Sequence, residues 1–227
     1  MGSAAADLTC NGNAAPTPGQ TITLSGNIVI AGAGTSGFTA TAYADSPLSV
    51  CSGDNCATSL GTATTDCNGN FSTSVTLNGS SIDGYVSVAP SGDVATLGYA
   101  GEPLDKSESL QALVFPTSLL SILGAVVPSC SGTNTKAMIG VIVTDCAGQR
   151  ITDTADITLT ASQSGTQVGS AYDISQLAPD LAGFYLICNL PAGATDLNAA
   201  YLSKTFLKNT VQAVTGDATE AIVRPGY

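Results

Sequence analysis

Apolar and polar residues alternate with a period of two along several short segments of the first half of the chain. The alternation is clearest in 21–30, and it returns after a glycine-rich turn in 38–43. A period of two places successive side chains on opposite faces of a β-strand. The first half is therefore predicted to contain short strands at 21–30, 38–43, 61–65, 71–77 and 85–89.

The same alternation returns after residue 136. It predicts further strands at 137–144, 155–161, 183–188, 194–201, 207–213 and 218–224. Short strands separated only by turn residues are typical of antiparallel sandwiches rather than of βαβ sheets. We therefore expect an all-β protein made of two tandem antiparallel seven-strand-type β-sandwiches of the immunoglobulin-like kind.

The alternation stops between the two halves. Residues 105–108 form the densest charge cluster, and the segment 116–124 is rich in Leu and Ile. The apolar spacing, with Thr117 or Ser118 as N-cap and Gly124 at the end, predicts a short helix. The expected organisation is a flexible leader at 1–19, a first sandwich at 20–104, a connector with the helix at 105–131 and a second sandwich at 132–227.

Charged residues are scarce, and this excludes several functions. Only 10% of the 227 residues are charged, with 17 Asp+Glu against 6 Lys+Arg and a net charge of −11. The 28 Thr and 24 Ser must therefore supply much of the polar surface. Six cations cannot form the clustered basic surface that nucleic acid requires. Because the chain has no His, Ser-His-Asp and Cys-His catalysis and His-ligated metals are excluded as well. We expect no enzymatic activity and no cofactor.

Seven cysteines without a CxxC pair indicate structural disulfides rather than a metal site. Cys51 and Cys56 enclose only four residues, so we expect them to pair. Cys10 and Cys67 are then expected to tie the leader to the first sandwich. One bond and one free thiol remain for the second half, among Cys130, Cys146 and Cys188. Disulfides imply an extracytoplasmic location, which makes an extracellular or cell-surface protein the expectation.

Two hypotheses would attach the chain to a membrane, a lipid anchor and a transmembrane span. Cys10 could carry a lipid anchor, although Asp7, Leu8 and Thr9 before it fit a lipoprotein signal poorly, so a disulfide is favoured. The uncharged, apolar stretch 110–128 is interrupted by Pro116 and Gly124. It is better explained as a helix packed on a domain than as a transmembrane span.

Several carboxylates and aromatic residues are candidate binding groups. Asp66, Asp145 and Asp180 each precede a Gly in a tight turn, where the carboxylate can accept backbone N–H groups. A weaker hypothesis is a calcium site, since one loop holds the densest local set of carboxylates, Asp145, Asp153 and Asp156. Tyrosines can stack on sugars, but without any Trp we expect most of them to be packing residues.

The apolar positions of the expected helix are a candidate assembly surface. These positions are Leu119, Leu120, Ile122 and Leu123. They either pack under the helix or form a docking surface for another copy of the chain. Sandwich edges with few charges do little to prevent edge-to-edge pairing, which favours self-association into a layer or fibre.

The second half resembles the carboxypeptidase regulatory-like domains, which are transthyretin-like β-sandwiches of bacterial surface proteins and lipoproteins. The resemblance rests on a strand that ends in Asp145-Cys-Ala-Gly148, on Gly183-Phe-Tyr, and on Asn189-Leu-Pro-Ala-Gly193. It covers about residues 137–225 and is weaker in the first half, at Asp66-Cys-Asn-Gly69-Asn-Phe71. It implies a role in structure, adhesion or presentation and supplies no catalytic residues.

The favoured function is thus a non-catalytic extracellular structural or adhesive protein that contacts copies of itself or another cell-surface protein. The alternative is an accessory module of a surface lipoprotein that binds carbohydrate or a cell-envelope component. A third hypothesis, an enzyme that uses carboxylates, requires a pocket in which two acids converge.

Overall fold

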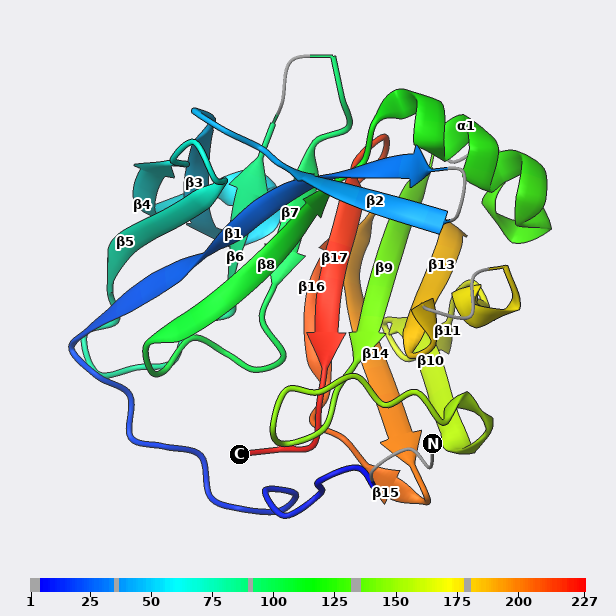
Figure 1. Ribbon diagram of the computed structural model, residues 1–227. Coiled ribbons are helices and arrows are strands. Elements are labelled where there is room, and N and C mark those ends of the chain that lie inside the picture. The colour runs from blue at the N-terminus through cyan, green and yellow to red at the C-terminus, as the bar shows by residue number, and fades with distance from the viewer. Residues whose placement is uncertain (1–4, 35–36, 90–91, 132–135, 178–180) are drawn as a thin grey trace.

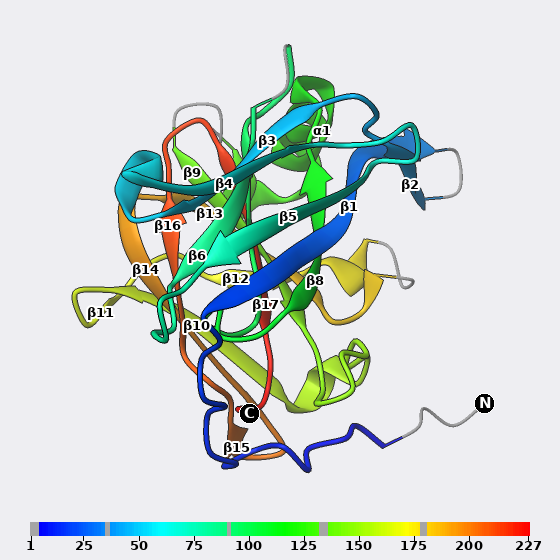
Figure 2. The same cartoon turned by 90° about the vertical axis from the view of Figure 1, so that its left-hand side faces the viewer.

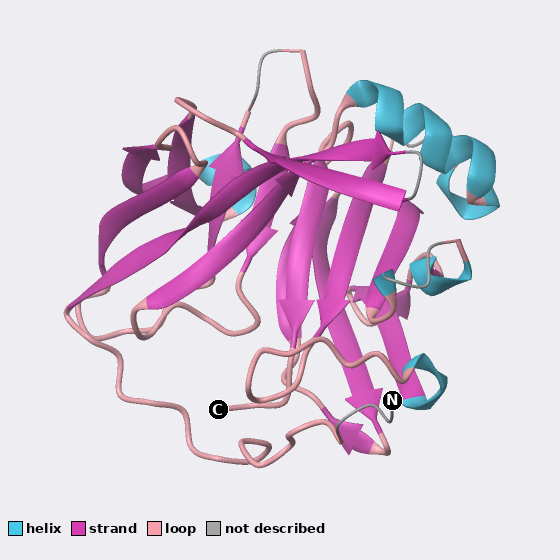
Figure 3. Ribbon diagram, in the orientation of Figure 1, coloured by secondary structure: helices cyan, strands magenta, loops and turns pink. Residues whose placement is uncertain are grey.

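The computed structural model describes residues 5–34, 37–89, 92–131, 136–177 and 181–227. Strands predominate, as the sequence predicts, and a single α-helix lies among the described residues (Figure 3). The first half contains β1 (Thr21–Gly34), β2 (Gly37–Ala42), β3 (Pro47–Ser52), β4 (Thr58–Thr64), β5 (Asn70–Thr76), β6 (Gly84–Val88), β7 (Thr96–Tyr99), β8 (Glu108–Val114) and α1 (Thr117–Val126). The second half contains β9 (Ala137–Val143), β10 (Ile157–Gln163), β11 (Thr166–Gln167), β12 (Ala171–Asp173), β13 (Phe184–Leu190), β14 (Gly193–Tyr201), β15 (Lys204–Thr205), β16 (Asn209–Ala213) and β17 (Ala218–Val223).

A single eight-stranded sheet runs through both halves of the chain. Its strand order is β12-β13-β9-β17-β7-β6-β3-β4, so the last strand of the sequence lies at its centre (Figure 1). β17 is parallel to β9 on one side and to β7 on the other. The expectation of two separate antiparallel sandwiches is therefore not confirmed, because backbone hydrogen bonds join the two halves in one sheet.

A four-stranded sheet covers one face of the first-half strands. β1 is long enough to pair with two strands along one edge, with β5 through Thr21–Asn27 and with β2 through Val29–Gly34. Its other edge pairs with β8 in parallel. Leu24 and Ile28 of this sheet pack against Val50 and Val86 of the eight-stranded sheet in one buried cluster.

A five-stranded sheet covers the opposite face of the eight-stranded sheet, as the rotated view shows (Figure 2). β10, β14 and β16 form its main part. Tyr85 and Val86 are neighbours in β6 but belong to different clusters, since successive side chains of a strand point to opposite faces. The cluster under the five-stranded sheet combines Tyr85 and Tyr99 from the first half with Ile139 and Val223 from the second.

The helix α1 covers a third cluster on the remaining part of the first face, above the ends of β9 and β13 (Figure 1). Its N-cap is Pro116, with no side-chain cap, so the expected caps Thr117 and Ser118 are wrong. It continues past Gly124 and ends at Val126. The N–H of the next residue, Val127, still donates to the carbonyl of Leu123. None of the helices in the described ranges has the length and apolar character of a membrane span.

The expected connector 105–131 is only partly a connector. It begins with β8, which supplies Leu110, Ala112 and Val114 to the core of the four-stranded sheet. β3 and β7 were also not predicted from the sequence. β7 is buried along its whole length, so it has no alternation of apolar and polar residues to reveal it.

The described part of the leader is attached to the second half of the chain rather than flexible. The N–H of Asp7 donates to Oδ2 of Asp145 at 3.0 Å, and the N–H of Cys146 donates to the carbonyl of Asp7 at 2.8 Å. Leu8 packs against the cluster under the five-stranded sheet. Further along, the N–H of Gly19 donates to the carbonyl of Asp105.

Candidate functional site

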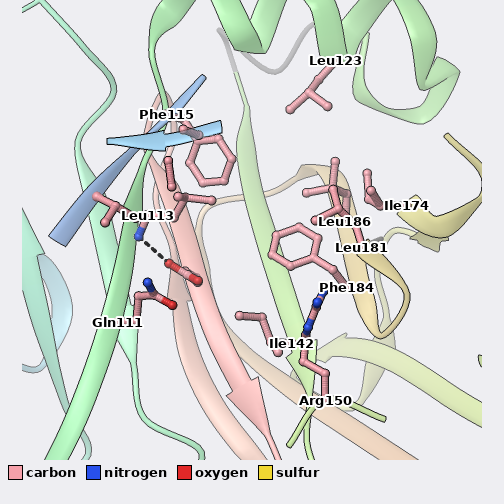
Figure 4. Close-up of a pocket in the computed structure, with 14 residues that line it drawn as sticks. Gln111, Leu113, Phe115, Leu123, Ile142, Arg150, Ile174, Leu181, Phe184 and Leu186 are labelled. Atoms are coloured by element: carbon pink, nitrogen blue, oxygen red, sulfur yellow. Dashed lines mark hydrogen bonds between the residues drawn. The ribbon is translucent and has the colours of Figure 1, made fainter. Parts of the chain in front are cut away.

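A cavity of about 360 Å³ lies between β8, the sheet face formed by β9 and β13, and the helix α1 (Figure 4). β1 and β2 of the four-stranded sheet also reach the cavity, through Val29, Ala31 and Ala40. Over β9 and β13 this face is covered by α1 and by Ile174, which also lines the cavity. The walls are mainly apolar and include Leu113, Leu123, Ile142, Phe184 and Leu186.

β8 forms one wall of the cavity, since one face of the strand packs in the core and the other lines the cavity. Leu110, Ala112 and Val114 point into the core of the four-stranded sheet, while Gln111, Leu113 and Phe115 line the cavity. β8 is also an edge strand. β1 occupies its other edge, so the N–H of Leu113 has no strand partner.

Glu220 supplies the missing acceptor. It stands in β17, on the strand face opposite Ala221 and Val223, and only 4% of its surface is exposed. Its Oε2 accepts a hydrogen bond from the N–H of Leu113 at 2.6 Å, the dashed line in Figure 4. Burial raises the pKa of Glu220 to about 7, and the Leu113 hydrogen bond acts in the opposite direction. The cavity therefore contains a carboxyl group that titrates near neutral pH.

The sequence reasoning did not single out Glu220. A visible signal existed, because Glu220 stands between apolar residues in the strand segment Ala218-Thr-Glu-Ala-Ile-Val223. A charged residue within a predicted core strand indicates either an edge or a buried polar contact. What it contacts is decided by β8, which the sequence assigned to the connector.

Two other carboxyl groups converge outside this cavity, at Glu102 and Glu108. Each of them shifts the pKa of the other, and Lys106 and Arg224 lie against Glu102. Burial, followed by the neighbouring Glu102, raises the pKa of Glu108 to about 8. Burial alone would raise the pKa of Glu102, but Glu108 and the two cations lower it.

This acid pair does not form an open catalytic site. The side chain of Glu102 is fully enclosed and that of Glu108 is 11% exposed. Neither residue lines the apolar cavity or a second cavity of about 250 Å³ near Asp145 and Tyr201. The pair links the start of β8 to the end of β17, since Arg224 follows β17 directly.

The structure contains three disulfide bonds. The predicted bond Cys51–Cys56 is present. The expected pairing of Cys10 with Cys67 is wrong, because Cys10 bonds to Cys146 across 136 residues. With its sulfur in that bond, Cys10 has none free for a lipid. Cys130 pairs with Cys188, and the free thiol is the exposed Cys67 rather than a cysteine of the second half.

The acidic turn residues Asp66 and Asp145 accept backbone N–H groups within their turns. Oδ1 of Asp66 accepts the N–H groups of Asn68 and Asn70, and Asp145 accepts those of Ala147 and Gln149 in the same way. Among the described residues no group of three or more acidic or cysteine side chains is arranged to hold a metal ion, and the calcium site stays a prediction. Both oxygens of Asp145 accept backbone N–H groups. Asp180 lies outside the described residues.

Most residues of the two other candidate surfaces, the helix positions and the tyrosines, are buried in the folded protein. Three of the four helix positions expected as an assembly surface are buried, Leu119, Leu120 and Leu123, and only Ile122 is exposed. Several tyrosines are in the core, including Tyr85 and Tyr99, whose rings stack 4.9 Å apart. Dispersed, buried tyrosines do not form a platform for sugars.

No protein-family model matches the sequence, and no curated protein matches it either. The carboxypeptidase regulatory-like resemblance therefore stays a prediction. Among solved structures, the chain is similar to the Bacillus anthracis TIE protein, at 11% identity and a TM-score of 0.29. It is also similar to a minor pilin of Streptococcus agalactiae, at 10% identity and a TM-score of 0.28, and to a fimbrial protein of Bacteroides ovatus, at 14% and 0.26.

The coverage of these similarities differs. The alignments cover 91%, 89% and 92% of this chain, in the same order. They cover 35% of the TIE protein, 94% of the minor pilin and 49% of the fimbrial protein. The chain thus spans about a third of the length of the first of them. Likenesses at such TM-scores carry no argument about function.

Proposed function

We propose that the protein is a non-catalytic structural or adhesive module exposed on the outside of a cell. The observation that carries this proposal is the set of three disulfide bonds, which persist in oxidising compartments. Each bond stabilises a different part of the fold. Cys51 belongs to the cluster under the five-stranded sheet, Cys130 and Cys188 to the cluster under α1, and Cys10–Cys146 holds the leader.

Both ends of the chain are anchored close together, which suits a module that must keep its shape. The leader is bonded to Cys146, just after β9, and β17 pairs with β9. At this place the N–H of Thr144 donates to the carbonyl of Val223 at 3.0 Å. Neither the leader nor the last strand can separate without breaking a covalent bond or the centre of a sheet.

The enclosed acid pair supports a role without catalysis. General acid–base chemistry requires a carboxyl group within hydrogen-bond reach of a bound substrate. The ion pairs of Glu102 with Lys106 and Arg224 engage this site internally. Self-assembly into a layer or fibre stays a prediction, and the buried helix positions give it no surface.

The exposed thiol of Cys67 provides a direct test of location. Intact cells of the natural source are treated with a membrane-impermeant maleimide, and the protein is then isolated and analysed by mass spectrometry. We expect one label per chain, at Cys67, and after reduction a further mass increase of six hydrogens, two for each disulfide. A C67S variant is the matched control and should take no label. Labelling of wild-type protein only after lysis, or seven reactive thiols in the native protein, contradicts the proposal.

A further inference from the structure

The apolar cavity combines an apolar wall with one buried carboxyl group. Its volume of about 360 Å³ is at the small end of the range of about 300–1,000 Å³ for sites that bind small molecules. Its polar lining residues are Gln111, Arg150 and Glu220, and the rest are apolar. Of these three, Glu220 is the most buried.

Glu220 has unused hydrogen-bonding capacity that faces the cavity. Oε2 accepts from the N–H of Leu113, while within the described part of the chain no hydrogen bond or ion pair reaches Oε1. No cation lowers the pKa of Glu220 either, since burial and the Leu113 hydrogen bond are the two influences on it. Oε1 can therefore accept a hydrogen bond from a molecule bound in the cavity.

We propose that this cavity binds a small, largely apolar molecule that carries one amine group, whose N–H donates a hydrogen bond to Oε1 of Glu220. The apolar body of such a ligand would contact Leu113, Phe184 and Leu186. Its protonated amine would provide the positive charge that the buried carboxylate lacks. Binding of the cation would also lower the pKa of Glu220, because an adjacent opposite charge favours the ionised form.

Other occupants fit the cavity less well. A peptide strand of several residues needs more volume than the cavity has. A sugar would leave many hydroxyl groups against Leu, Ile and Phe side chains without partners. A carboxylic acid would bring a second negative charge to Glu220. A neutral alcohol could donate to Oε1 but would not compensate its charge.

Three ligands with one ring system separate these cases. Naphthylmethylamine, naphthylmethanol and naphthoic acid are titrated into the full chain near neutral pH by isothermal calorimetry. We expect the amine to bind with a Kd of about 1 mM or tighter, and at least about tenfold more tightly than the alcohol. The acid should bind most weakly.

Variants then locate the binding site. E220Q keeps an acceptor for Leu113 but loses the charge, so the affinity for the amine should fall to that for the alcohol. I142W fills the cavity and should remove binding of both ligands. I122W places the same side chain on the exposed face of α1 and should change nothing. Thermal unfolding of each variant shows whether it is folded.

Several results of these titrations would overturn the proposal. It is overturned if the amine does not bind, if the alcohol or the acid binds equally well, or if I142W binds the amine as wild type does. It is overturned also if a folded E220Q retains full affinity for the amine. If E220Q does not fold, the ligand series and the I142W and I122W pair decide the matter alone.

Discussion

Cys10 and Cys146 are 136 residues apart in the sequence, and a disulfide bond joins them. The loop that they close contains the whole first half of the chain and β9. It therefore restricts the unfolded chain far more than Cys51–Cys56, whose cysteines are only 5 residues apart. Since both bonds are made within one fold, they offer a direct comparison of a long closed loop with a short one.

Removal of the long loop should destabilise the protein more than removal of the short one. On chain entropy alone, C10S/C146S should lower the free energy of unfolding by about 5 kcal/mol and C51S/C56S by about 2 kcal/mol. Urea denaturation of oxidised protein measures both values. Equal losses, or a larger loss in C51S/C56S, would contradict the dependence on loop length.

The three glutamates of the chain should titrate separately from one another. They are Glu102, Glu108 and Glu220, so selective carbon-13 labelling of glutamate yields only three carboxyl signals in NMR spectra. We expect midpoints of about 7 for Glu220 and about 8 for the proton of the acid pair, with Glu102 below its ordinary range. E220Q should remove the first of these midpoints and E108Q the second. Three signals that all titrate near 4.5 would contradict the burial of these groups.

The raised pKa of Glu220 has a defined effect on stability. Between pH 4.5 and about 7 the folded chain holds a proton on Glu220 that the unfolded chain has lost, so this contribution to stability is lost as pH rises through that interval. E220Q has no such proton. The free energy of unfolding of E220Q relative to wild type should therefore increase from pH 4.5 to above 7, as measured by urea denaturation. A constant difference would mean that Glu220 titrates alike in both states.

The close contact between β1 and β8 can be tested at Gly26. A Cβ built on Gly26 would lie 1.8 Å from the carbonyl oxygen of Leu110, and this atom belongs to rigid backbone. G26A should therefore lower the free energy of unfolding by at least about 2 kcal/mol. G19A is the matched control, because a Cβ there meets nothing closer than 3.5 Å. Similar stabilities of the two variants in thermal unfolding would contradict the parallel pairing of β1 with β8.

Local patterns in the sequence predicted many elements but not their partners. The expected strands at 71–77 and 194–201 match β5 (Asn70–Thr76) and β14 (Gly193–Tyr201) closely. The helix was expected at its place, although its N-cap and its last residue were wrong. β8 (Glu108–Val114) shows alternation too, but it lies in the expected connector 105–131, next to the charge cluster at 105–108.

The candidate site was less predictable than the strands. Glu220 is visible in the sequence as a charged residue within an apolar strand, but its partner Leu113 is 107 residues away. Their contact depends on the insertion of β17 between β9 and β7, which leaves the edge of β8 facing Glu220. No local pattern encodes such an insertion, because parallel strands need long connections and their order follows from packing.

The sequence by itself determined what depends on neighbouring residues. The two-residue period gave strands, Asp66 and Asp145 formed turns with the next few N–H groups, and the short spacing of Cys51 and Cys56 allowed them to pair. Only the tertiary structure decided the place of β17, the bond between Cys10 and Cys146, and the cavity around Glu220. The physical reason is that these features arise from the burial of sheet faces against one another. Such burial brings together residues that are more than a hundred positions apart.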